Sequence, residues 1–215
     1  MLDVHPPHEP IHGWRDFFIH LATITIGLLI ALGLEGCVEW MHHRHLVHEA
    51  QTALRNEISG NEGRMSDVLA SVQKQEEELK HDVIVLKQRI AHPKDNDHQS
   101  MSIDIRIVGF DDVSWKTAQN IGALTYMPYA RVEEYAAIYD LQEELDTVQK
   151  QAARDAALSI GRFMNADSTE PAARIAEDQQ EIRRIQVVQG QLYFYESLIK
   201  GLDGYYKKFL AAHPE

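Results

Sequence analysis

Residues Trp14–Trp40 carry the sequence WRDFFIHLATITIGLLIALGLEGCVEW, and the expected organisation of the whole chain follows from them. No side chain from Phe17 to Leu34 carries a formal charge, and His20 is the one ionisable group in that stretch. At about 1.5 Å per residue, a helix of this length approaches the ~30 Å hydrocarbon layer of a bilayer. The two tryptophans stand at its ends, where indole rings prefer the headgroup level of a membrane. The stretch therefore predicts a single transmembrane helix.

Two other interpretations of this stretch are a buried core helix and a signal peptide. A core helix of this length normally carries a polar stripe, whereas Thr23 and Thr25 are the only hydroxyls between Leu21 and Leu34. A signal peptide begins with basic residues and ends in a small-residue cleavage site. Here the leader MLDVHPPHEPIHGW is acidic and rich in histidine, and the apolar run ends in a glutamate-rich segment. We therefore expect the span to be retained.

The composition limits the partners of this 215-residue chain. Its formal net charge is −12; residues 1–40 contain one arginine and five acids, a net of −4, which leaves −8 for the rest of the chain. A protein that binds nucleic acid needs clustered lysine and arginine, so we expect no nucleic-acid partner. The acidic remainder is also unsuited to lie flat on anionic lipid. Cys37 is the only cysteine, which excludes an intrachain disulfide.

A stripe of small residues follows one face of the expected span. Thr23, Gly27 and Ala31 recur every four residues, and Glu35 continues the same face toward the membrane boundary. Small residues let two helix backbones approach closely in lipid, where packing replaces the hydrophobic drive. The stripe predicts a helix–helix interface, and with it a homo-oligomer or a complex with another membrane protein. The alternative is that glycine and alanine are simply common in membrane helices.

His20 lies about one turn inside the expected membrane layer. Ionisable groups at such a depth are candidates for function, although a neutral histidine near a helix end also reaches the interface. If two chains associate, one histidine from each supplies a pair of axial ligands for a haem. The sequence leaves both interpretations open.

Residues 41–49, MHHRHLVHE, have the most unusual local composition of the chain. If the helix continues through them, His42, His45 and Glu49 share one face. Imidazole and carboxylate are ligands of transition metals, so His42, His45, His48 and Glu49 form a candidate metal site. The alternative is a polar collar at headgroup level, whose imidazoles titrate near neutral pH.

The leader, residues 1–16, holds a second and weaker set of metal-ligand types. His5, His8 and Glu9 are candidate ligands in an extended geometry. The prolines of this segment prevent a regular helix, so the alternative is a flexible polar tail.

The orientation of the span is weakly encoded. Arg15 stands on the leader side, against Arg44 and Arg55 on the other side. Because cytoplasmic flanks carry an excess of lysine and arginine, this balance leans toward a cytoplasmic C-terminal domain. A periplasmic domain stays open.

From Val47 onward the apolar residues follow the spacing of long amphipathic helices. One seam alternates steps of four and three, with Glu76 in its one polar place, and predicts a nearly continuous helix to about Ala91. Ser59-Gly60 and Gly63 weaken this helix, and His92-Pro93 ends it. Three isoleucines then alternate with other residues and predict a short strand. The seam residues are Met65, Leu69, Val72, Leu79, Val83, Leu86 and Ile90, and the isoleucines are Ile103, Ile105 and Ile107.

One short and two long helices are expected after that strand. Asp111-Asp112 is expected to cap a short helix from Val113 to about Leu124. Pro128 is expected in the first turn of a helix that runs to about Asn165, and Pro171 starts the last helix. The expected core faces are Ile138, Leu141, Leu145, Val148, Ala152, Ala156, Ile160 and Phe163, then Ile175, Ile182, Ile185, Leu192, Tyr195, Ile199, Leu202, Tyr206 and Phe209.

These elements predict an all-α fold, in which an N-terminal transmembrane helix continues into an elongated antiparallel bundle of three long helices plus one short, with at most one short strand. The expected segments are a flexible leader (1–16), a transmembrane helix (17–40) and a helical bundle domain (41–215). Two sets of tyrosines are expected to meet across the bundle, as core packing or around a ligand pocket. The sets are Tyr126, Tyr129, Tyr135 and Tyr139, then Tyr193, Tyr195, Tyr205 and Tyr206.

Three runs of sequence carry a resemblance to a known group. They are IGLLIALGLEGCVEW at residues 26–40, SWKTAQNIGALTYMPY at 114–129 and YAAIYDLQ at 135–142. With them the chain resembles uncharacterised bacterial single-span membrane proteins that have a GLLIAL-type N-terminal span and a helical soluble domain. The resemblance implies a bacterial inner-membrane setting, and it transfers no functional residue.

The function most consistent with these patterns is a non-enzymatic, membrane-anchored helical module, acting as an accessory or structural subunit of a membrane complex. The alternative is a metal- or haem-binding accessory subunit that uses the histidines. An enzyme is not expected, since the sequence has no phosphate-binding glycine loop, no nucleophile elbow and no HExxH motif.

Overall fold

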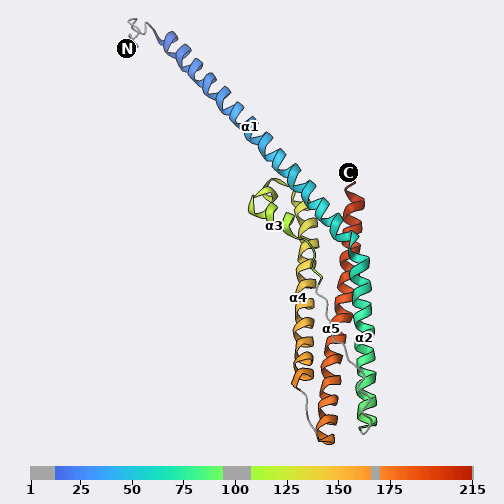
Figure 1. The fold of residues 1–215 in the computed structure, drawn as a ribbon. Helices are drawn as coiled ribbons and strands as arrows, with labels where there is room; N and C mark the ends of the chain where they lie inside the picture. Colours follow the sequence, from blue (N-terminus) through green and yellow to red (C-terminus); the bar gives the residue numbers. More distant parts are fainter. Residues whose placement is uncertain (1–12, 94–107, 166–169, 215) are drawn as a thin grey trace, which may run out of the picture. The chain divides into compact units, whose positions relative to one another are not determined.

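The computed structural model describes residues 13–93, 108–165 and 170–214 of the chain. They form α1 (Trp14–Gly63), α2 (Met65–Ala91), α3 (Val113–Asn120), the 3-10 helix η1 (Ala123–Tyr126), α4 (Tyr129–Asn165) and α5 (Pro171–Ala212) (Figure 1). These residues include no strand, which confirms the all-α class; the isoleucine segment 103–107 lies outside them. The chain divides into two compact units, Met1–Glu49 and Ala50–Glu215, so the last turns of α1 belong to the second unit.

A single residue separates α1 from α2. Arg64 keeps near-helical backbone angles, φ −94° and ψ −8°, and its N–H donates to the carbonyl of Asn61 over 3.2 Å. Gly63, one of the glycines expected to weaken this stretch, ends α1 directly before it. Glycine costs about 1 kcal/mol relative to alanine inside a helix, so an interruption is least costly at this place.

In the second unit, α5 packs against both α2 and α4 (Figure 1). Arg89, near the end of α2, pairs with Asp178, near the start of α5, whereas Gln73 bonds Glu196 further along α5. This order of contacts makes α2 and α5 antiparallel. Figure 1 shows α4 running in the same direction as α2, and therefore also antiparallel to α5. With three packed helices two must share a direction, and here they are α2 and α4.

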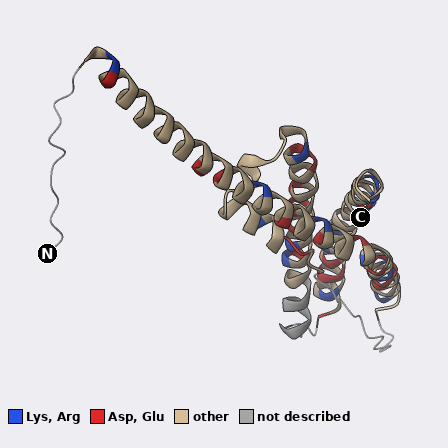
Figure 2. Cartoon of the chain, turned by 90° about the horizontal axis from the view of Figure 1, so that it is seen from above, with Lys and Arg blue, Asp and Glu red and all other residues tan. Residues whose placement is uncertain are grey.

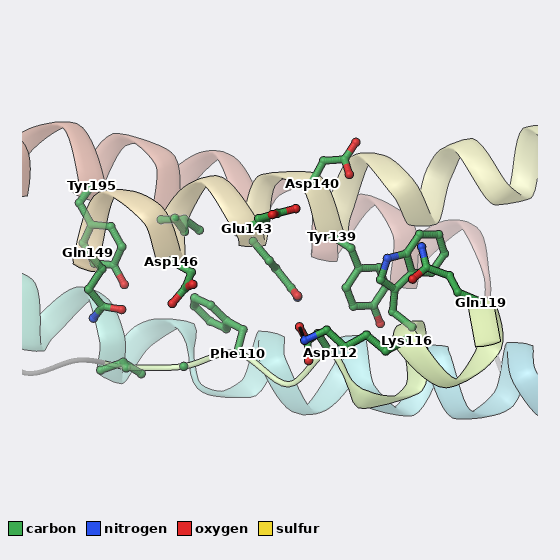
Figure 3. A pocket seen from close by; sticks show the side chains of 15 residues that line it. Phe110, Asp112, Lys116, Gln119, Tyr139, Asp140, Glu143, Asp146, Gln149 and Tyr195 are labelled. Carbon is green, nitrogen blue, oxygen red and sulfur yellow. Dashed lines mark ion pairs between the residues drawn. The ribbon is translucent and has the colours of Figure 1, made fainter. Parts of the chain in front are cut away.

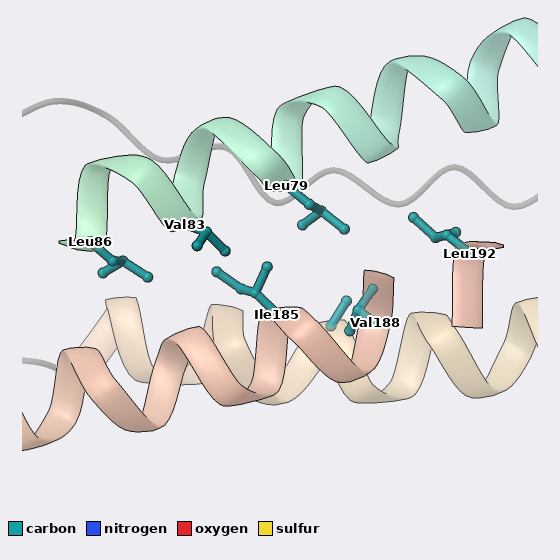
Figure 4. Close-up of a cluster of buried hydrophobic side chains, with 7 residues drawn as sticks. Leu79, Val83, Leu86, Ile185, Val188 and Leu192 are labelled. Atoms are coloured by element: carbon teal, nitrogen blue, oxygen red, sulfur yellow. The ribbon is translucent and has the colours of Figure 1, made fainter. Parts of the chain in front are cut away.

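The apolar core repeats one spacing in all three long helices. Buried positions advance by three and four residues along α2, α4 and α5, which keeps one face of each helix toward its neighbours. Figure 4 shows part of this core, where side chains of α2 meet those of α5. Burying one such leucine contributes about 2 kcal/mol. The cluster comprises Leu79, Val83, Leu86, Ala156, Ile185, Val188 and Leu192.

The centre of the buried face differs from the predicted one by about one position. In α2 the expected seam residues Leu69 and Ile90 are only half-buried, whereas Gln75 and Asp82 have exposures of 5% and 2%. The other seam residues are buried as predicted. The offset arises because apolar residues also occupy the flanks of the face, while polar residues stand at its centre. The same offset leaves Leu141, Val148, Ile175 and Ile182 half-buried beside buried Gln142, Gln149, Asp178 and Glu181.

Two buried acids near the start of α5 are paired with arginines. Arg89 of α2 contacts Asp178 over 3.3 Å, and Arg184 contacts Glu181 over 3.4 Å within α5 itself. The arginine heads keep partial access to water, at 38% and 35% exposure, while the carboxylates are almost fully covered. A buried charge costs several kcal/mol unless it is paired, so these arginines are what makes the acids tolerable in the core.

The cap of α3 comes from another helix and not from the predicted Asp111-Asp112 pair. Asp112 holds the N-cap position but makes no side-chain cap hydrogen bond, because its carboxylate pairs with Lys116 at 2.6 Å. Glu57 of α1 instead accepts hydrogen bonds from the backbone N–H groups of Ser114 (2.7 Å) and Trp115 (3.4 Å). A carboxylate at this end also complements the helix dipole. The prediction of a local cap was therefore wrong.

The helices beyond α3 differ from their predicted boundaries by a few residues. The short helix ends at Asn120 and not at Leu124, since Gly122 adopts the left-handed φ of 73° that leads into η1. Pro128 precedes α4 and does not lie in its first turn; its carbonyl accepts the N–H of Arg131 over 2.9 Å. Pro171 opens α5 as predicted.

Candidate functional site

The first candidate site is the apolar part of α1 at residues 17–34, which follows the charged first turn of that helix. Among the described residues, one helical segment is long and apolar enough to cross a membrane, and its 18-residue window has a mean hydropathy of 2.3 with no residue buried. Figure 2 shows this part of α1 as an unbroken tan ribbon, without lysine, arginine, aspartate or glutamate. A core helix is mostly buried, so the exposure does not fit that interpretation. We refer to the segment below as the candidate span.

The hydroxyls of the candidate span are satisfied within their own helix. Thr23 Oγ1 donates to the carbonyl of Ile19 over 2.9 Å, and Thr25 Oγ1 donates to that of Leu21 over 2.8 Å. A polar group surrounded by hydrocarbon costs several kcal/mol unless it is hydrogen-bonded. The two threonines therefore add little to the cost of placing this helix in lipid.

The predicted interface face of the candidate span is open. Thr23, Gly27 and Ala31 are all exposed, as is Glu35 at the end of the same face. A Cβ placed on Gly27 would meet nothing within 4 Å, so no other described part of the chain covers this position. A second helix has room to approach the backbone here.

The histidines of residues 41–49 form pairs with nearby acids and not a cluster. His45 Nε2 lies 3.1 Å from Glu49, and His43 Nε2 lies 4.0 Å from Glu39, each one turn away on α1. Beside them the guanidinium of Arg44 lies 5.3 Å from the ring centre of Trp40, a cation–π distance.

The predicted metal ligands are only partly brought together. In the described ranges no three His, Cys, Asp or Glu side chains lie close enough to hold a metal ion. Of His42, His45, His48 and Glu49, the structure joins His45 to Glu49. His20 is exposed on the candidate span, whereas His5, His8 and Glu9 lie outside the described residues.

A polar junction on the last turns of α1 escaped the sequence analysis. Asn61 is fully buried; its amide donates to the carbonyl of Asp111 over 2.8 Å and accepts the N–H of Asp111 over 2.9 Å. The hydroxyl of Tyr139 donates to Glu57 over 2.7 Å. Burial, reinforced by this carboxylate, raises the pKa of Tyr139 well above its usual value. Asn61 follows Ile58 by three residues and so occupies the next core position of α1. A polar residue at such a position was the one sequence feature that could have predicted this junction.

Four of the eight tyrosines are buried in the bundle, two from each of the two sets. Tyr135 of α4 packs against Phe209 of α5, with ring centres 5.2 Å apart. Gln142 of α4 donates to the hydroxyl of Tyr206, and Tyr195 is the fourth buried phenol. The exposed members are Tyr126, Tyr129, Tyr193 and Tyr205.

The second candidate site is a cavity of about 460 Å³ within the second unit (Figure 3). Residues 108–119, α4 and Tyr195 of α5 line it, with aromatic side chains beside carboxylates. Figure 3 shows the ring of Tyr195 projecting into it past α4.

Burial raises the pKa of Tyr195 to about 12, and the charge of Asp146 adds to the shift. The pKa of Lys116 is also raised, mainly by Asp112 and further by Glu143 and Asp146. The shift of Lys116 indicates a negative potential, whereas that of Tyr195 arises mainly from burial.

Comparison with known proteins does not add a relative from which residue roles could be taken. The chain matches no protein-family model, and no curated protein and no solved structure is significantly similar to it.

Proposed function

We propose that the chain is a membrane-anchored helical module that assembles with itself or with another membrane protein. The exposed apolar window of α1 carries this proposal. Leaving a side chain such as Ile24 or Leu28 in water forgoes about 1.5–3 kcal/mol relative to burying it, and more than ten large apolar side chains of the segment are exposed. A bilayer removes all of that surface from water at once.

The open face of Thr23, Gly27 and Ala31 supports assembly within the membrane. Helices in lipid associate through close packing, and small residues at every fourth position let the backbones come near. The partner is a second copy of the chain or a span of another membrane protein. In this arrangement the bundle is the part that a membrane complex presents to the aqueous side, as an accessory or structural subunit.

The proposed location is a bacterial inner membrane, supported by the resemblance of the span to GLLIAL-type single-span proteins. Arg44 and Arg55 against Arg15 favour the bundle on the cytoplasmic side. Because Cys37 is the only cysteine, a Cys37→Ser variant with Ser197→Cys places one thiol on the exposed surface of α5. Labelling by a membrane-impermeant maleimide in intact cells would place the bundle outside the cytoplasm; labelling only after lysis supports the proposed side.

Assembly is tested by Gly27→Ile in the full chain, measured as the crosslinked fraction in native membranes. Gly36→Ile is the matched control, because Gly36 lies on the opposite face of the helix from Gly27, about 2.5 turns further on, and also has nothing within 4 Å of a Cβ. We expect Gly27→Ile to lower the oligomer fraction at least about fivefold, a loss of ~1 kcal/mol, and Gly36→Ile to leave it unchanged. An unchanged oligomer fraction in Gly27→Ile would remove this interface from the proposal.

The alternative function is a metal- or haem-binding accessory subunit, and the 3.1 Å pair of His45 and Glu49 is the observation that favours it. In an oligomer the same pair from a second copy would complete a four-ligand set, and two copies of His20 would supply bis-histidine ligation. Metal analysis and an absorption spectrum of the purified oligomer decide between the two functions. A Soret band or stoichiometric metal supports the alternative, and the absence of both from the oligomer purified from native membranes argues against it.

A further inference from the structure

The cavity of the second unit has the size of a site for a small organic ligand. Its volume of about 460 Å³ falls within the roughly 300–1,000 Å³ that is usual for ligand pockets. Its walls come from residues 108–195, entirely within the second unit, so a ligand here is independent of membrane anchoring and of the proposed function.

The charge of the walls favours a cation. Four carboxylates and one ammonium line the cavity. Asp112 pairs with Lys116 over 2.6 Å, and Asp146 contacts Lys150 outside the cavity. The other two acids, Asp140 and Glu143, have no ion-pair partner among the residues that the structure describes, so they offer charge to a ligand.

The acids form a row and not a cluster. Asp140, Glu143 and Asp146 follow one another at three-residue intervals on α4, about 4.5 Å apart along the helix axis. A single metal ion needs ligands that converge, and within the described part of the chain no such set of three is present. Amines joined by three or four methylene groups have a comparable spacing. The row therefore fits an extended molecule with several positive charges.

Two buried polar atoms in the cavity wall have no hydrogen-bond partner among the described residues. Tyr195 is 2% exposed, and in this part of the chain its hydroxyl makes no hydrogen bond. Gln142 is 7% exposed; its amide nitrogen donates to Tyr206, but its Oε1 accepts no hydrogen bond from the described residues. Each such buried atom costs about 1–3 kcal/mol. A ligand with N–H donors satisfies Gln142 Oε1 and the phenol oxygen at once.

The aromatic side chains complete the match to an amine with an aliphatic chain. Trp115 stacks on Tyr139, with ring centres 5.0 Å apart and planes nearly parallel, and Phe110 lines the same cavity. Methylene groups pack on such faces, and an ammonium group within about 6 Å of a ring centre gains a cation–π attraction.

From the row of acids, the two unpartnered polar atoms and the aromatic wall, we infer that this cavity binds a linear aliphatic polyamine, with Glu143 pairing an ammonium group and Tyr195 hydrogen-bonding another.

The test uses spermidine and the full-length chain in detergent, by calorimetric titration at fixed ionic strength. Glu143→Gln is compared with Glu144→Gln, which removes the same charge from the next exposed residue of α4, outside the cavity. We expect Glu143→Gln to weaken spermidine binding about fivefold, because a partly solvated ion pair contributes about 1 kcal/mol. Glu144→Gln leaves the dissociation constant unchanged. Triethylene glycol, uncharged and of similar length, does not bind.

Tyr195→Phe provides a second test, because it removes the hydroxyl and keeps the ring. A weaker spermidine affinity in this variant is therefore not explained by altered packing. Because the Tyr195 hydroxyl has no hydrogen-bond partner among the described residues, the variant is expected not to lower the unfolding midpoint at pH 7, while spermidine binding weakens about tenfold. Equal weakening by Glu143→Gln and Glu144→Gln overturns the proposal, since it shows attraction to overall negative charge. Unchanged affinity in Tyr195→Phe, binding of triethylene glycol, or no binding of spermidine overturns it as well.

Discussion

The two units of the chain dispose their side chains in opposite ways. From residue 13 to residue 42 of the first unit every residue is exposed, including each large apolar side chain of the candidate span. The second unit buries charged residues, and Glu181 is fully inaccessible. The first unit thus needs an apolar surrounding that the described chain does not supply, whereas the second supplies partners for polar groups that water would otherwise solvate. This difference is the one expected if the first unit lies in a bilayer, as proposed, and the second unit lies in water.

The largest expected effect is the loss of membrane association when charged residues, like those on the surface of the second unit, are placed in the candidate span. Ile24→Arg together with Leu28→Arg places two charges in the middle of the candidate span, at about 2.5–3.5 kcal/mol each. We expect the protein to leave the membrane fraction after carbonate extraction. Val187→Arg, on an exposed apolar residue of the bundle, is the control and should not change fractionation. A double variant that stays in the membrane would show that another part of the chain anchors it.

A smaller effect is expected from removing the carboxylate that caps α3. Glu57→Ala leaves the N–H of Ser114 and the hydroxyl of Tyr139 without their acceptor, which costs about 2 kcal/mol of unfolding free energy. Amide hydrogen exchange at Ser114 and Trp115 should become faster, by a larger factor than elsewhere in α4 and α5. Glu77→Ala, on the exposed face of α2, tests whether charge alone matters. Equal exchange rates in the two variants would contradict the capping role.

Alkaline pH should act on the second unit through Tyr195. The unfolded chain loses the phenol proton from about pH 10, whereas the folded chain keeps it to about pH 12. The folded state therefore binds the proton more tightly, and unfolding free energy falls as pH rises through this window, by about 1 kcal/mol at pH 11. Tyr195→Phe should remove that part of the decline and should not lower stability at pH 7. Parallel stability curves for the two proteins from pH 9 to pH 11 would show that Tyr195 does not cause it.

The smallest expected effect is an increase in the unfolding free energy of the second unit. Gln75 is 5% exposed, and among the described residues its amide donates a hydrogen bond only to Ser71, over 3.3 Å. Gln75→Leu should raise the unfolding free energy by about 1 kcal/mol, because an apolar side chain of similar volume loses no hydration on burial. Gln88→Leu, exposed on the same helix, should change it by less than about 0.5 kcal/mol. A clear loss in Gln75→Leu would show that polar groups in this core stabilise the fold.

Helices and their order follow from apolar spacing, but the composition of the core does not. The spacing locates residues such as Leu79 and Leu86 correctly, because an apolar side chain on a periodic face has few other places to go. It misses Gln75 and Asp82, because a polar residue looks the same in sequence whether it is solvated or buried between helices. Only Asn61, which interrupts an otherwise apolar series, left a detectable signal.

The candidate sites were predictable to different degrees for the same reason. The exposed segment of α1 is local, so eighteen consecutive residues are enough to indicate it. The cavity combines Trp115, Glu143 and Tyr195 from three separate elements, and no periodicity within one helix brings them together. The cap of α3 by Glu57 likewise joins residues more than fifty positions apart, where local capping rules pointed to Asp112.

The buried acids of α5 have a consequence for how the bundle assembles. Because apolar contacts recur every seven residues along α2 and α5, sliding one helix by a single repeat would exchange one aliphatic layer for another at little cost. Arg89 pairs with Asp178, and seven residues before Arg89 stands another buried acid, Asp82, so the same slide would separate Asp178 from its arginine. The ion pair therefore favours one register of α2 against α5, which the repeating apolar contacts alone would not specify.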